Sequence, residues 1–419
     1  MRHAGTGLRA FAALALCASL GAGVAATAAN DPPAEQVPGT RIQVLADGLP
    51  PPFATPSASN GPQRVMRPEN PPFRLPPGFS VAIFADKLTN PRSLLTLPNG
   101  DELLAESKAG AITLLRDADG DGVAEFRAVF ADGFARPYGL AFQGGQIYVA
   151  DTAAVWQIPY GDGDERARGP ARPITSRGAL GGDRGHWTRN LAFSPDGSRF
   201  YVAIGSQSNL GEDPIPRASV QSFAVDGQDQ RTYASGLRNP VGMAFYPGTE
   251  DLYVVVNERD GLGDGLVPDF LTRLAPDGFY GWPYAYIGPH PQPGLAAPPG
   301  VVEKTVVPDL LFRPHSAPLG LVFYEGDQFP AAYRGDAFVA LHGSWNSSRP
   351  TGYMVARVPF ENGRPKGYYE PFLTGFWLGG YERAYVFGRP AGLAVAKDGS
   401  LLVADDVANL IWRVTYAAP

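Results

Sequence analysis

Basic and imidazole side chains recur along this sequence, each at the same position relative to the start of a short apolar run. Examples are Arg136-Pro-Tyr-Gly-Leu-Ala-Phe142, His186-Trp-Thr-Arg-Asn-Leu-Ala-Phe193 and Arg238-Asn-Pro-Val-Gly-Met-Ala-Phe245. The side chains at this position are Arg92, Arg136, His186, Arg189, Arg238, His315 and Arg389. Brought together, such groups would bind an anion through charge-assisted hydrogen bonds.

The elements that must bring them together form a repeat. The apolar run recurs six times, and a turn and a second β-rich run follow each copy. Counted from Ser93, Gly139, Asn190, Gly242, Gly320 and Gly392, the intervals are 46, 51, 52, 78 and 72 residues. The first three match one propeller blade, and the last two indicate insertions. We therefore predict an all-β fold, a six-bladed β-propeller.

A propeller places the innermost strand of every blade against one axis. The residue just before each inner strand then lies at the mouth of the central channel, so the basic positions should converge there. We also expect Phe79–Ala85 to pair with Leu410–Tyr416 in one blade and close the ring, which leaves no free sheet edge.

The N-terminal segment predicts export. Residues 1–28 contain Arg2 and Arg9, a short apolar run and Ala26-Thr-Ala28, which together are typical of a secretory signal peptide. We expect a periplasmic or secreted protein with no transmembrane segment in the mature chain. Cys17, the single cysteine, lies inside this segment, so the mature chain would have no disulfide.

Two further regions complete the predicted organisation. Residues 29–74 are rich in Pro, Ala and Ser and are interpreted as an N-terminal arm, either disordered or a strap along the propeller. Residues 75–419 would form the propeller domain. Since Arg2 and Arg9 are lost with the signal and no acidic residue is, the net charge changes from −6 to −8. This acidic balance argues against nucleic acid as a partner.

His186 is the candidate general base. A histidine before a strand is often only a cap or a packed ring. On an axis lined with arginines, however, the imidazolium form would be disfavoured by like charge, which keeps a neutral base available. His315 and His342 are further candidates for ligand contact.

Two acidic loops could hold a cation. Asn257–Asp264, followed by Asp269, offers carboxylates and glycine-freed carbonyls that suit calcium, although an ordinary solvated loop would have the same composition. Asp117-Ala-Asp-Gly-Asp-Gly122 imitates the front of an EF-hand loop, but Ala128 stands where the bidentate Glu belongs. A hairpin turn is the alternative there.

The chain resembles the sorbosone dehydrogenase family, which is related to soluble quinoprotein glucose dehydrogenases. The resemblance covers essentially residues 70–416, and its motifs are ordered along the chain. They are Leu75-Pro-Pro-Gly-Phe79, Gly185-His-Trp-Thr-Arg-Asn190, Gly236-Leu-Arg-Asn-Pro-Val-Gly242, Asn257-Glu-Arg-Asp260, Phe279-Tyr-Gly-Trp-Pro283, His342-Gly-Ser-Trp-Asn346 and Gly388-Arg-Pro-Ala-Gly392.

This resemblance implies pyrroloquinoline quinone (PQQ), a tricarboxylate, on the axis with Ca²⁺. His186 would remove the proton of the substrate hydroxyl. Quinone contacts would come from Arg238 and Asn239, with Arg136, His315, His342 and Arg389 also facing the cofactor. Asp260 and Gly261 would offer backbone oxygens to calcium.

One residue departs from the family pattern. Gly185 precedes His186 where the glucose dehydrogenases have an aspartate, so the group that orients the histidine must come from elsewhere. Asp183 is the candidate.

The substrate would be a sugar, an osone or another hydroxyl or hydrated aldehyde compound, and a periplasmic carrier such as a cytochrome or quinone would accept the electrons. Two alternatives remain. One is a non-enzymatic propeller that binds an anionic ligand, and the other is a calcium-dependent lactonase. A lactonase would require Asp, Asn and Glu at the channel mouth, where this sequence places arginines.

Overall fold

The computed structural model describes residues 34–418, so the predicted signal peptide lies outside the described residues. Strands dominate this part of the chain, and its only helices are four 3₁₀ turns. These turns are η1 (Ala34–Gln36), η2 (Ala46–Gly48), η3 (Val302–Lys304) and η4 (Ala331–Tyr333).

Six antiparallel sheets of four strands form the blades, and five of them follow one another along the chain. The first is β3 (Pro91–Thr96), β4 (Glu102–Glu106), β5 (Ala111–Arg116) and β6 (Phe126–Asp132); the second is β7 (Gly139–Gln143), β8 (Gln146–Ala150), β9 (Val155–Pro159) and β10 (Arg172–Pro173). The third is β11 (Arg189–Phe193), β12 (Arg199–Ile204), β13 (Ser219–Ala224) and β14 (Arg231–Ser235), to which β18 (Gly278–Phe279) adds in parallel. The fourth is β15 (Asn239–Phe245), β16 (Leu252–Asn257), β17 (Phe270–Arg273) and β21 (Leu310–Leu311); the fifth is β22 (Pro318–Phe323), β23 (Ala337–Leu341), β24 (Met354–Val358) and β27 (Glu370–Leu373).

The sixth blade joins the two ends of the propeller. It contains β30 (Pro390–Val395), β31 (Leu401–Asp405) and β32 (Leu410–Tyr416), and its outer strand is β2 (Phe79–Ala85). β2 pairs with β32 in antiparallel register, from Phe79 opposite Tyr416 to Ala85 opposite Ile411. The predicted ring closure is therefore confirmed.

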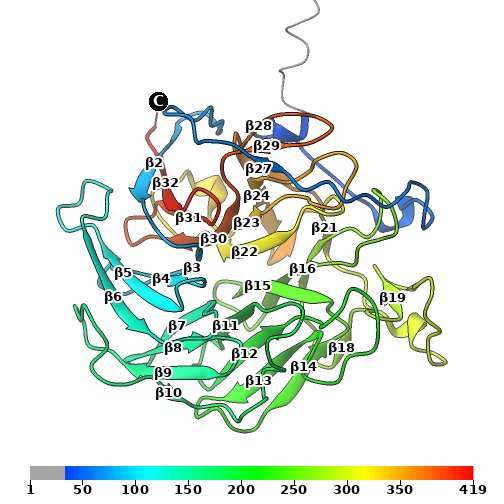
Figure 1. The fold of residues 1–419 in the computed structure, drawn as a ribbon, viewed down its shortest axis with the longest axis horizontal. Coiled ribbons are helices and arrows are strands. Elements are labelled where there is room, and N and C mark those ends of the chain that lie inside the picture. Colours follow the sequence, from blue (N-terminus) through cyan, green and yellow to red (C-terminus); the bar gives the residue numbers. More distant parts are fainter. Residues whose placement is uncertain (1–33, 419) are drawn as a thin grey trace, which may run out of the picture.

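The first strand of each blade faces the centre of the ring (Figure 1). β3, β7, β11, β15, β22 and β30 contact one another in this order, and β30 returns to β3. The fold is the predicted six-bladed β-propeller.

Burial between blades explains why the second strand of each blade is apolar on both faces. In β16, Val254 packs against the third blade and its neighbour Val255 packs against the fifth. Six such hydrophobic clusters fill the six spaces between neighbouring blades. A sheet covered on both faces replaces the alternating polar pattern of a half-exposed strand with a continuous apolar run.

The glycine repeated in the inner strands allows neighbouring blades to meet backbone to backbone. A Cβ placed on Gly139 would lie 2.5 Å from the carbonyl oxygen of Arg189 in the next inner strand, and one on Gly392 would lie 2.2 Å from that of Arg92. Gly242 and Gly320 face the same restriction, at 2.8 and 2.6 Å. None of the four has a positive φ, so space rather than backbone conformation requires glycine here.

Insertions lie where the long intervals indicated them. The first, between β17 and β22, contains the hairpin of β19 (Ala285–Tyr286) and β20 (His290–Pro291). The second follows β27 and contains β28 (Trp377–Gly379) and β29 (Tyr385–Val386), and a small hairpin of β25 (Phe360–Glu361) and β26 (Arg364–Pro365) precedes β27.

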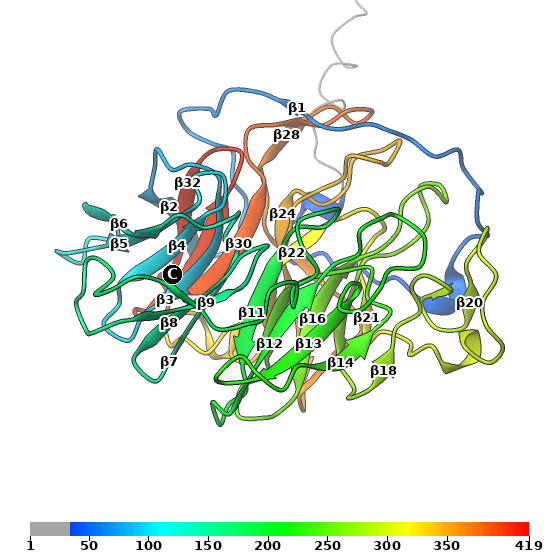
Figure 2. The same cartoon turned by 60° about the horizontal axis from the view of Figure 1, so that its bottom comes forward.

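The N-terminal arm runs across the propeller to these insertions (Figure 2). Its strand β1 (Gln63–Arg64) pairs in parallel with β29, and single bridges join Ile42 to Tyr369 and Arg74 to Thr374. From residue 34 onward the arm is thus a strap with defined contacts.

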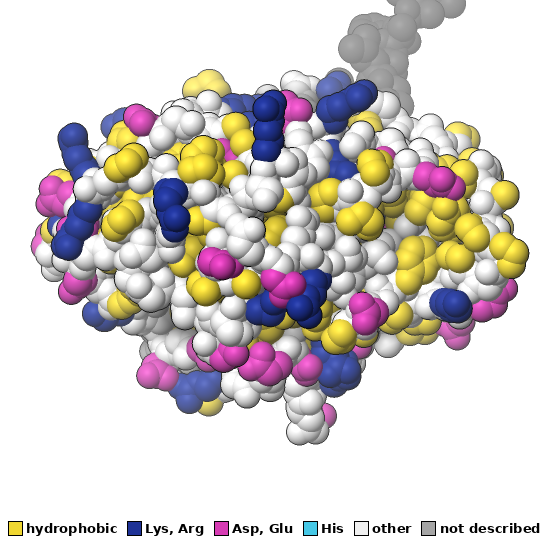
Figure 3. All heavy atoms as spheres, turned by 90° about the horizontal axis from the view of Figure 1, so that it is seen from below, with side chains coloured by type: hydrophobic (Ala, Val, Ile, Leu, Met, Phe, Trp, Pro, Cys, Tyr) yellow, Lys and Arg dark blue, Asp and Glu magenta, His cyan; other side chains and the backbone are white. Residues whose placement is uncertain are grey.

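On the face in Figure 3, acidic and basic side chains are interspersed and do not separate into patches of one sign.

Within residues 34–418, no helix has the length and apolar character needed to cross a membrane.

We predict that Gly392→Ala destabilises the fold. The added Cβ would overlap the Arg92 carbonyl, and overpacking of this kind costs about 1–3 kcal/mol. Denaturant unfolding of the variant measures the loss. Gly169→Ala is the control, because nothing lies within 4 Å of a Cβ there and Gly169 has no positive φ. Equal unfolding free energies for the two variants would contradict the steric explanation.

Candidate active site

A cavity of about 260 Å³ lies at the end of the ring where the inner strands begin. His186 precedes β11, Arg238 precedes β15 and His315 precedes β22, so the repeat itself brings the three together. The lining residues are His186, Arg238, Asn239, Asn257, Glu258, Asp260, Asp269, His315, Ala317, Trp345 and Asn346. Five of the predicted site residues are therefore in one pocket: His186, Arg238, Asn239, Asp260 and His315.

Arg238 organises this pocket through contacts with the protein. Its Nη1 donates to the Glu258 carbonyl at 2.7 Å and to the Asn257 carbonyl at 3.3 Å. Its Nη2 donates to Asn209 Oδ1 at 3.0 Å and to Asp260 Oδ2 at 3.1 Å. The guanidinium thus holds the 257–260 segment, a role that the sequence did not predict. Its contact with a quinone stays a prediction.

Asp260 is fixed from several sides. Asn209 accepts from its backbone N–H at 2.8 Å and donates to its carbonyl at 2.9 Å. Asn346 donates to its carboxylate Oδ1, and His315 Nδ1 lies 3.9 Å from the same oxygen. The other ring nitrogen of His315, Nε2, donates to the Gly263 carbonyl at 3.1 Å.

Two more carboxylates are buried beside this loop. Burial raises the pKa of Glu258 to about 8 and that of Asp269 to about 7, and Arg238 opposes both shifts. Asp269 accepts from the backbone N–H groups of Glu258 and Ala317. Glu258 Oε1 and Asn239 Oδ1 are buried with no hydrogen-bond partner among the described residues. Buried oxygens without a donor are uncommon, and they suit a cation.

His186 has a defined tautomer. Its Nδ1 lies 2.9 Å from the Ser206 carbonyl oxygen, which can only accept, so Nδ1 carries the proton. Nε2 is then the acceptor nitrogen, and it makes no hydrogen bond to any described residue. Burial first and the charge of Arg238 second lower the pKa of His186 to about 3. Gly205 permits this placement, because a Cβ there would lie 2.6 Å from His186 Cβ and 2.4 Å from Asn239 Oδ1.

The orienting group is not the expected one. Asp183 is exposed and makes no hydrogen bond to His186. The backbone carbonyl of Ser206, at the turn after β12, takes this place, and the Ser206 hydroxyl lies 3.0 Å from the same Nδ1. Every residue has a backbone carbonyl, so the residue types in the sequence do not reveal which carbonyl accepts this hydrogen bond.

A second cluster continues the ring on its other side. His342 Nε2 donates to Asp406 Oδ1 at 2.8 Å, and Arg92 pairs with the other oxygen of the same carboxylate. Burial first and Arg389 second lower the pKa of His342 to about 4, with Asp406 opposing them. Burial alone would raise the pKa of Asp406, but His342 and Arg92 hold it well below its ordinary value.

The remaining basic residues differ in whether their side chains have hydrogen-bond partners in the protein. Arg389 donates to the carbonyls of His342 and Gly343. Arg136 is exposed and lies over the Trp187 ring at 5.3 Å, as does Arg92 on the same ring. Arg92 Nε is buried without a partner among the described residues. His342, Arg389 and Arg136 therefore surround the axis but do not line the cavity that contains His186.

Arg189 corrects the prediction that every basic position faces the channel. Its side chain is fully buried and donates to backbone carbonyls, including that of Leu180 at 2.9 Å and that of Thr188 at 2.7 Å. Arg189, the first residue of β11, therefore points into the blade, whereas His186 lies in the segment before the strand and faces the pocket.

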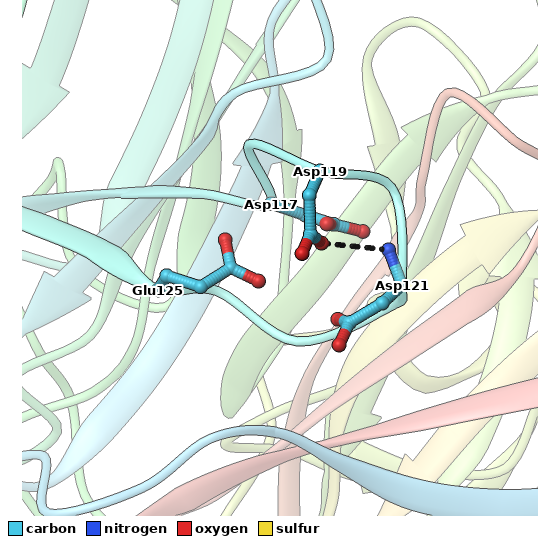
Figure 4. A group of neighbouring side chains, drawn as sticks. All are labelled: Asp117, Asp119, Asp121 and Glu125. Carbon is cyan, nitrogen blue, oxygen red and sulfur yellow. Dashed lines mark hydrogen bonds between the residues drawn. The ribbon is translucent and has the colours of Figure 1, made fainter.

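The acidic loop between β5 and β6 lies outside this pocket. Asp117, Asp119, Asp121 and Glu125 bring carboxylate oxygens within 4.8 Å of one another (Figure 4). The same carboxylates cap the turn, as Asp117 does for the N–H groups of Gly120 and Gly122. Glu125 is the ninth position of the loop, which the sequence reading overlooked. The turn is thus shown, and the calcium alternative stays a prediction.

Comparison with known proteins decides the family. The TrAA12-like family model matches residues 73–267 and 302–417. This chain belongs to the TrAA12-like family. The Glucose / Sorbosone dehydrogenase model matches residues 215–344, which confirms the resemblance drawn from the motifs.

Curated relatives of this TrAA12-like protein match over part of their length. An uncharacterized protein of Borreliella burgdorferi is 34% identical over 236 residues, which are 55% of this chain and 61% of the relative. A pyrroloquinoline quinone-dependent pyranose dehydrogenase of Coprinopsis cinerea is 28% identical over 221 residues, 42% of this chain and 30% of the relative. The match thus spans less than two thirds of either relative.

Solved structures share the fold over most of the chain. The holo form of the pyranose dehydrogenase PQQ domain from Coprinopsis cinerea has a TM-score of 0.69 at 22% identity and covers 85% of this chain and 99% of its own. The calcium structure of the Trichoderma reesei family AA12 enzyme has a TM-score of 0.67 at 20% identity, covering 84% and 100%. At these identities the likeness shows the propeller fold.

We predict that His186 makes the TrAA12-like protein less stable in acid. Its pKa is about 3 in the folded state and ordinarily 6.5, so between these values only the unfolded chain binds the proton. Stability should be complete above about pH 6.5 and decrease below it, by up to about 1.4 kcal/mol per pH unit.

Denaturant unfolding of wild type and His186→Gln at about pH 7 and about pH 4.5 measures this effect, since the glutamine does not titrate. The difference between the two unfolding free energies should shift against wild type at the lower pH. A difference that stays constant would show that His186 titrates normally in the fold.

Proposed function

We propose that this protein is a PQQ- and calcium-dependent dehydrogenase that oxidises a sugar, an osone or a related hydroxyl or hydrated aldehyde compound. The observation that carries the proposal is the geometry of His186. Its Nδ1 is committed to a carbonyl, its Nε2 is free in the pocket, and the ring is neutral at physiological pH. This is the arrangement of a positioned general base.

The residues of the pocket fit a divalent cation. Among the described residues, Asn239 Oδ1 and Glu258 Oε1 are buried acceptors without a donor, and Asp260 lines the same pocket. Hard cations are bound by such mixed carboxylate, amide and carbonyl oxygens. Asp260, Glu258 and Asn239 are the residues we assign to calcium, with the Gly261 carbonyl predicted from the family motif.

The basic residues beside the pocket fit a tricarboxylate. Within residues 34–418, the buried Arg92 Nε has no hydrogen-bond partner, and the exposed Arg136 makes no hydrogen bond and lies over the Trp187 ring. His342, which follows β23, and Arg389, which precedes β30, lie on the other side of Arg92 along the ring. Unsatisfied guanidinium donors favour carboxylates, which they can meet through paired hydrogen bonds.

The chain's own part in the reaction is to orient and to move a proton. His186 Nε2 accepts the proton of the substrate hydroxyl while the Ser206 carbonyl keeps the ring in place. Arg238 holds the 257–260 segment, and its positive charge helps to keep the His186 ring neutral by lowering the pKa of that ring. The quinone, when bound, supplies the hydride acceptor, and calcium polarises it.

The comparisons support a dehydrogenase over the two alternatives. The matches include the Glucose / Sorbosone dehydrogenase family model and a PQQ-dependent pyranose dehydrogenase. Our proposal includes export to the periplasm and electron transfer to a cytochrome or quinone there. The signal-like residues 1–28 support the export.

We predict that dye-linked dehydrogenase activity appears only when both PQQ and Ca²⁺ are added to the purified apo-protein. Activity with a panel of aldoses and osones identifies the substrate. His186→Gln should bind PQQ like wild type and turn over about two to four orders of magnitude more slowly. Activity that survives both a chelator and omission of the quinone would refute the assignment.

We further predict that Arg238→Lys weakens cation and quinone binding together. Lysine keeps the charge but loses the planar set of donors that now holds Asn209, Glu258 and Asp260. Loss of such charge-assisted bonds should weaken binding at least about tenfold.

Calorimetric titration of Ca²⁺ and of PQQ measures Arg238→Lys against wild type, with thermal unfolding as the control for misfolding. Unchanged affinity for both ligands would mean that Arg238 only packs the blade.

A further inference from the structure

The N-terminal arm reaches the pocket from outside. Residues 53–60 run over two loops that the blades leave without strand pairing, 260–264 and 345–348. Asp260 on the first loop and Trp345 and Asn346 on the second line the cavity that contains His186. The arm therefore covers the outer side of these two loops, and residues on their inner side line the cavity.

The arm forms hydrogen bonds with backbone groups of the first loop. Phe53 N donates to the Leu262 carbonyl at 2.8 Å, and the Asp264 N–H donates to Thr55 Oγ1 at 2.7 Å. Gly263, between them, has a φ of +100°, and a Cβ on it would lie 2.6 Å from the Thr55 carbonyl. Loop and arm are thus in direct backbone contact.

Asn60 grips the second loop. Its N–H donates to the Trp345 carbonyl at 2.6 Å, and its side-chain Nδ2 lies 3.1 Å from the Ser347 carbonyl and 3.2 Å from that of Ser348. The same Nδ2 lies 2.6 Å from the Glu382 carbonyl, in the insertion that carries β28 and β29. One asparagine therefore connects the loop to an element that is paired with the arm itself.

The two loops are also connected to each other, on both sides of the wall. On the outer side, the Asp264 carboxylate accepts from Ser348 N at 2.8 Å and from the Ser348 hydroxyl. On the inner side, Asn346 donates to the carboxylate of Asp260. A shift of either loop on the arm side is thereby transmitted to Asp260, the carboxylate at the centre of the assigned cation site.

We propose that residues 53–60 form an external brace for the site, in which Thr55 and Asn60 are positioning residues for Asp260 and Trp345. Holding a loop residue in one conformation opposes its backbone entropy, and these loops have no strand partner whose hydrogen bonds would offset that cost. The brace supplies the hydrogen bonds instead. Its effect on ligand affinity rests on the proposed function, whereas its effect on loop order does not.

Four single variants of the full-length protein test the brace. Thr55→Val removes the acceptor for Asp264 N, and Thr55→Ser keeps it as the conservative rescue. Asn60→Asp keeps the shape of the side chain but replaces the donor Nδ2 with a carboxylate oxygen. The carbonyl oxygens of Ser347, Ser348 and Glu382, which now accept from Nδ2, would repel it. Gln63→Ala is the matched control, because Gln63 lies in the same arm with an exposed side chain that makes no hydrogen bond among the described residues.

Two measurements are made on each variant. Hydrogen–deuterium exchange reports the amides of 260–264 and 345–348 without any ligand, and calorimetry with calcium chloride, alone and with PQQ, reports affinity. We expect faster exchange in both loops and about three- to tenfold weaker Ca²⁺ binding for Thr55→Val and Asn60→Asp. Thr55→Ser and Gln63→Ala should match wild type, and thermal unfolding should change little in all four.

The outcomes separate the brace from the function. Unchanged exchange in both loops overturns the brace, and so does faster exchange with unchanged ligand affinity. If wild type binds neither calcium nor PQQ, the proposed function fails, and the exchange data alone then decide the brace. Loss of affinity in Thr55→Ser as well would show that the hydroxyl is not the acting group, which also overturns the assignment of Thr55.

Discussion

The close approach of the inner strands governs the rest of this structure. At the axis neighbouring blades meet so tightly that Gly139, Gly242, Gly320 and Gly392 have no room for a Cβ. The residues just before these strands must then share a small space, whatever their sequence separation. His186, Arg238 and His315 come from three blades and line one pocket for this reason. The chemistry is therefore a property of the ring, and no single segment contains it.

Gathering positive charge in this way requires compensation, and the structure provides it locally. Arg238 donates to three backbone carbonyls, the side-chain amide of Asn209 and the Asp260 carboxylate, and Arg92 pairs with Asp406. A buried charge without such partners would cost several kcal/mol. Among the described residues, the buried atoms near the site that lack a partner include two acceptor oxygens, Asn239 Oδ1 and Glu258 Oε1, and guanidinium donors of Arg92 and of Arg217, whose Nη1 donates to the His186 carbonyl. Those atoms, more than the count of arginines, indicate which ligand charges the site would accept.

The sequence predicted the repeat, its period, the closing blade and five of the pocket residues, because each depends on residue types at regular intervals. It missed contacts that depend on backbone groups. Ser206 orients His186 through a carbonyl, where Asp183 was expected, and Arg189 is saturated by carbonyls inside its blade. Asn209 and Asp406 were missed for a different reason. Each lies in a loop outside the repeated motif, so no periodicity marked it.

The choice of a carbonyl over a carboxylate beside His186 has a chemical consequence. A carboxylate would stabilise the imidazolium, whereas a carbonyl offers only a dipole, and Arg238 opposes protonation directly. In the ligand-free site the histidine is consequently a weak base. Asn239, Glu258 and Asp260, which we propose as cation ligands, line the same pocket as His186, whereas the basic residues proposed for the carboxylates lie outside it. A cation held there would add to the field of Arg238 and would therefore keep the imidazole neutral.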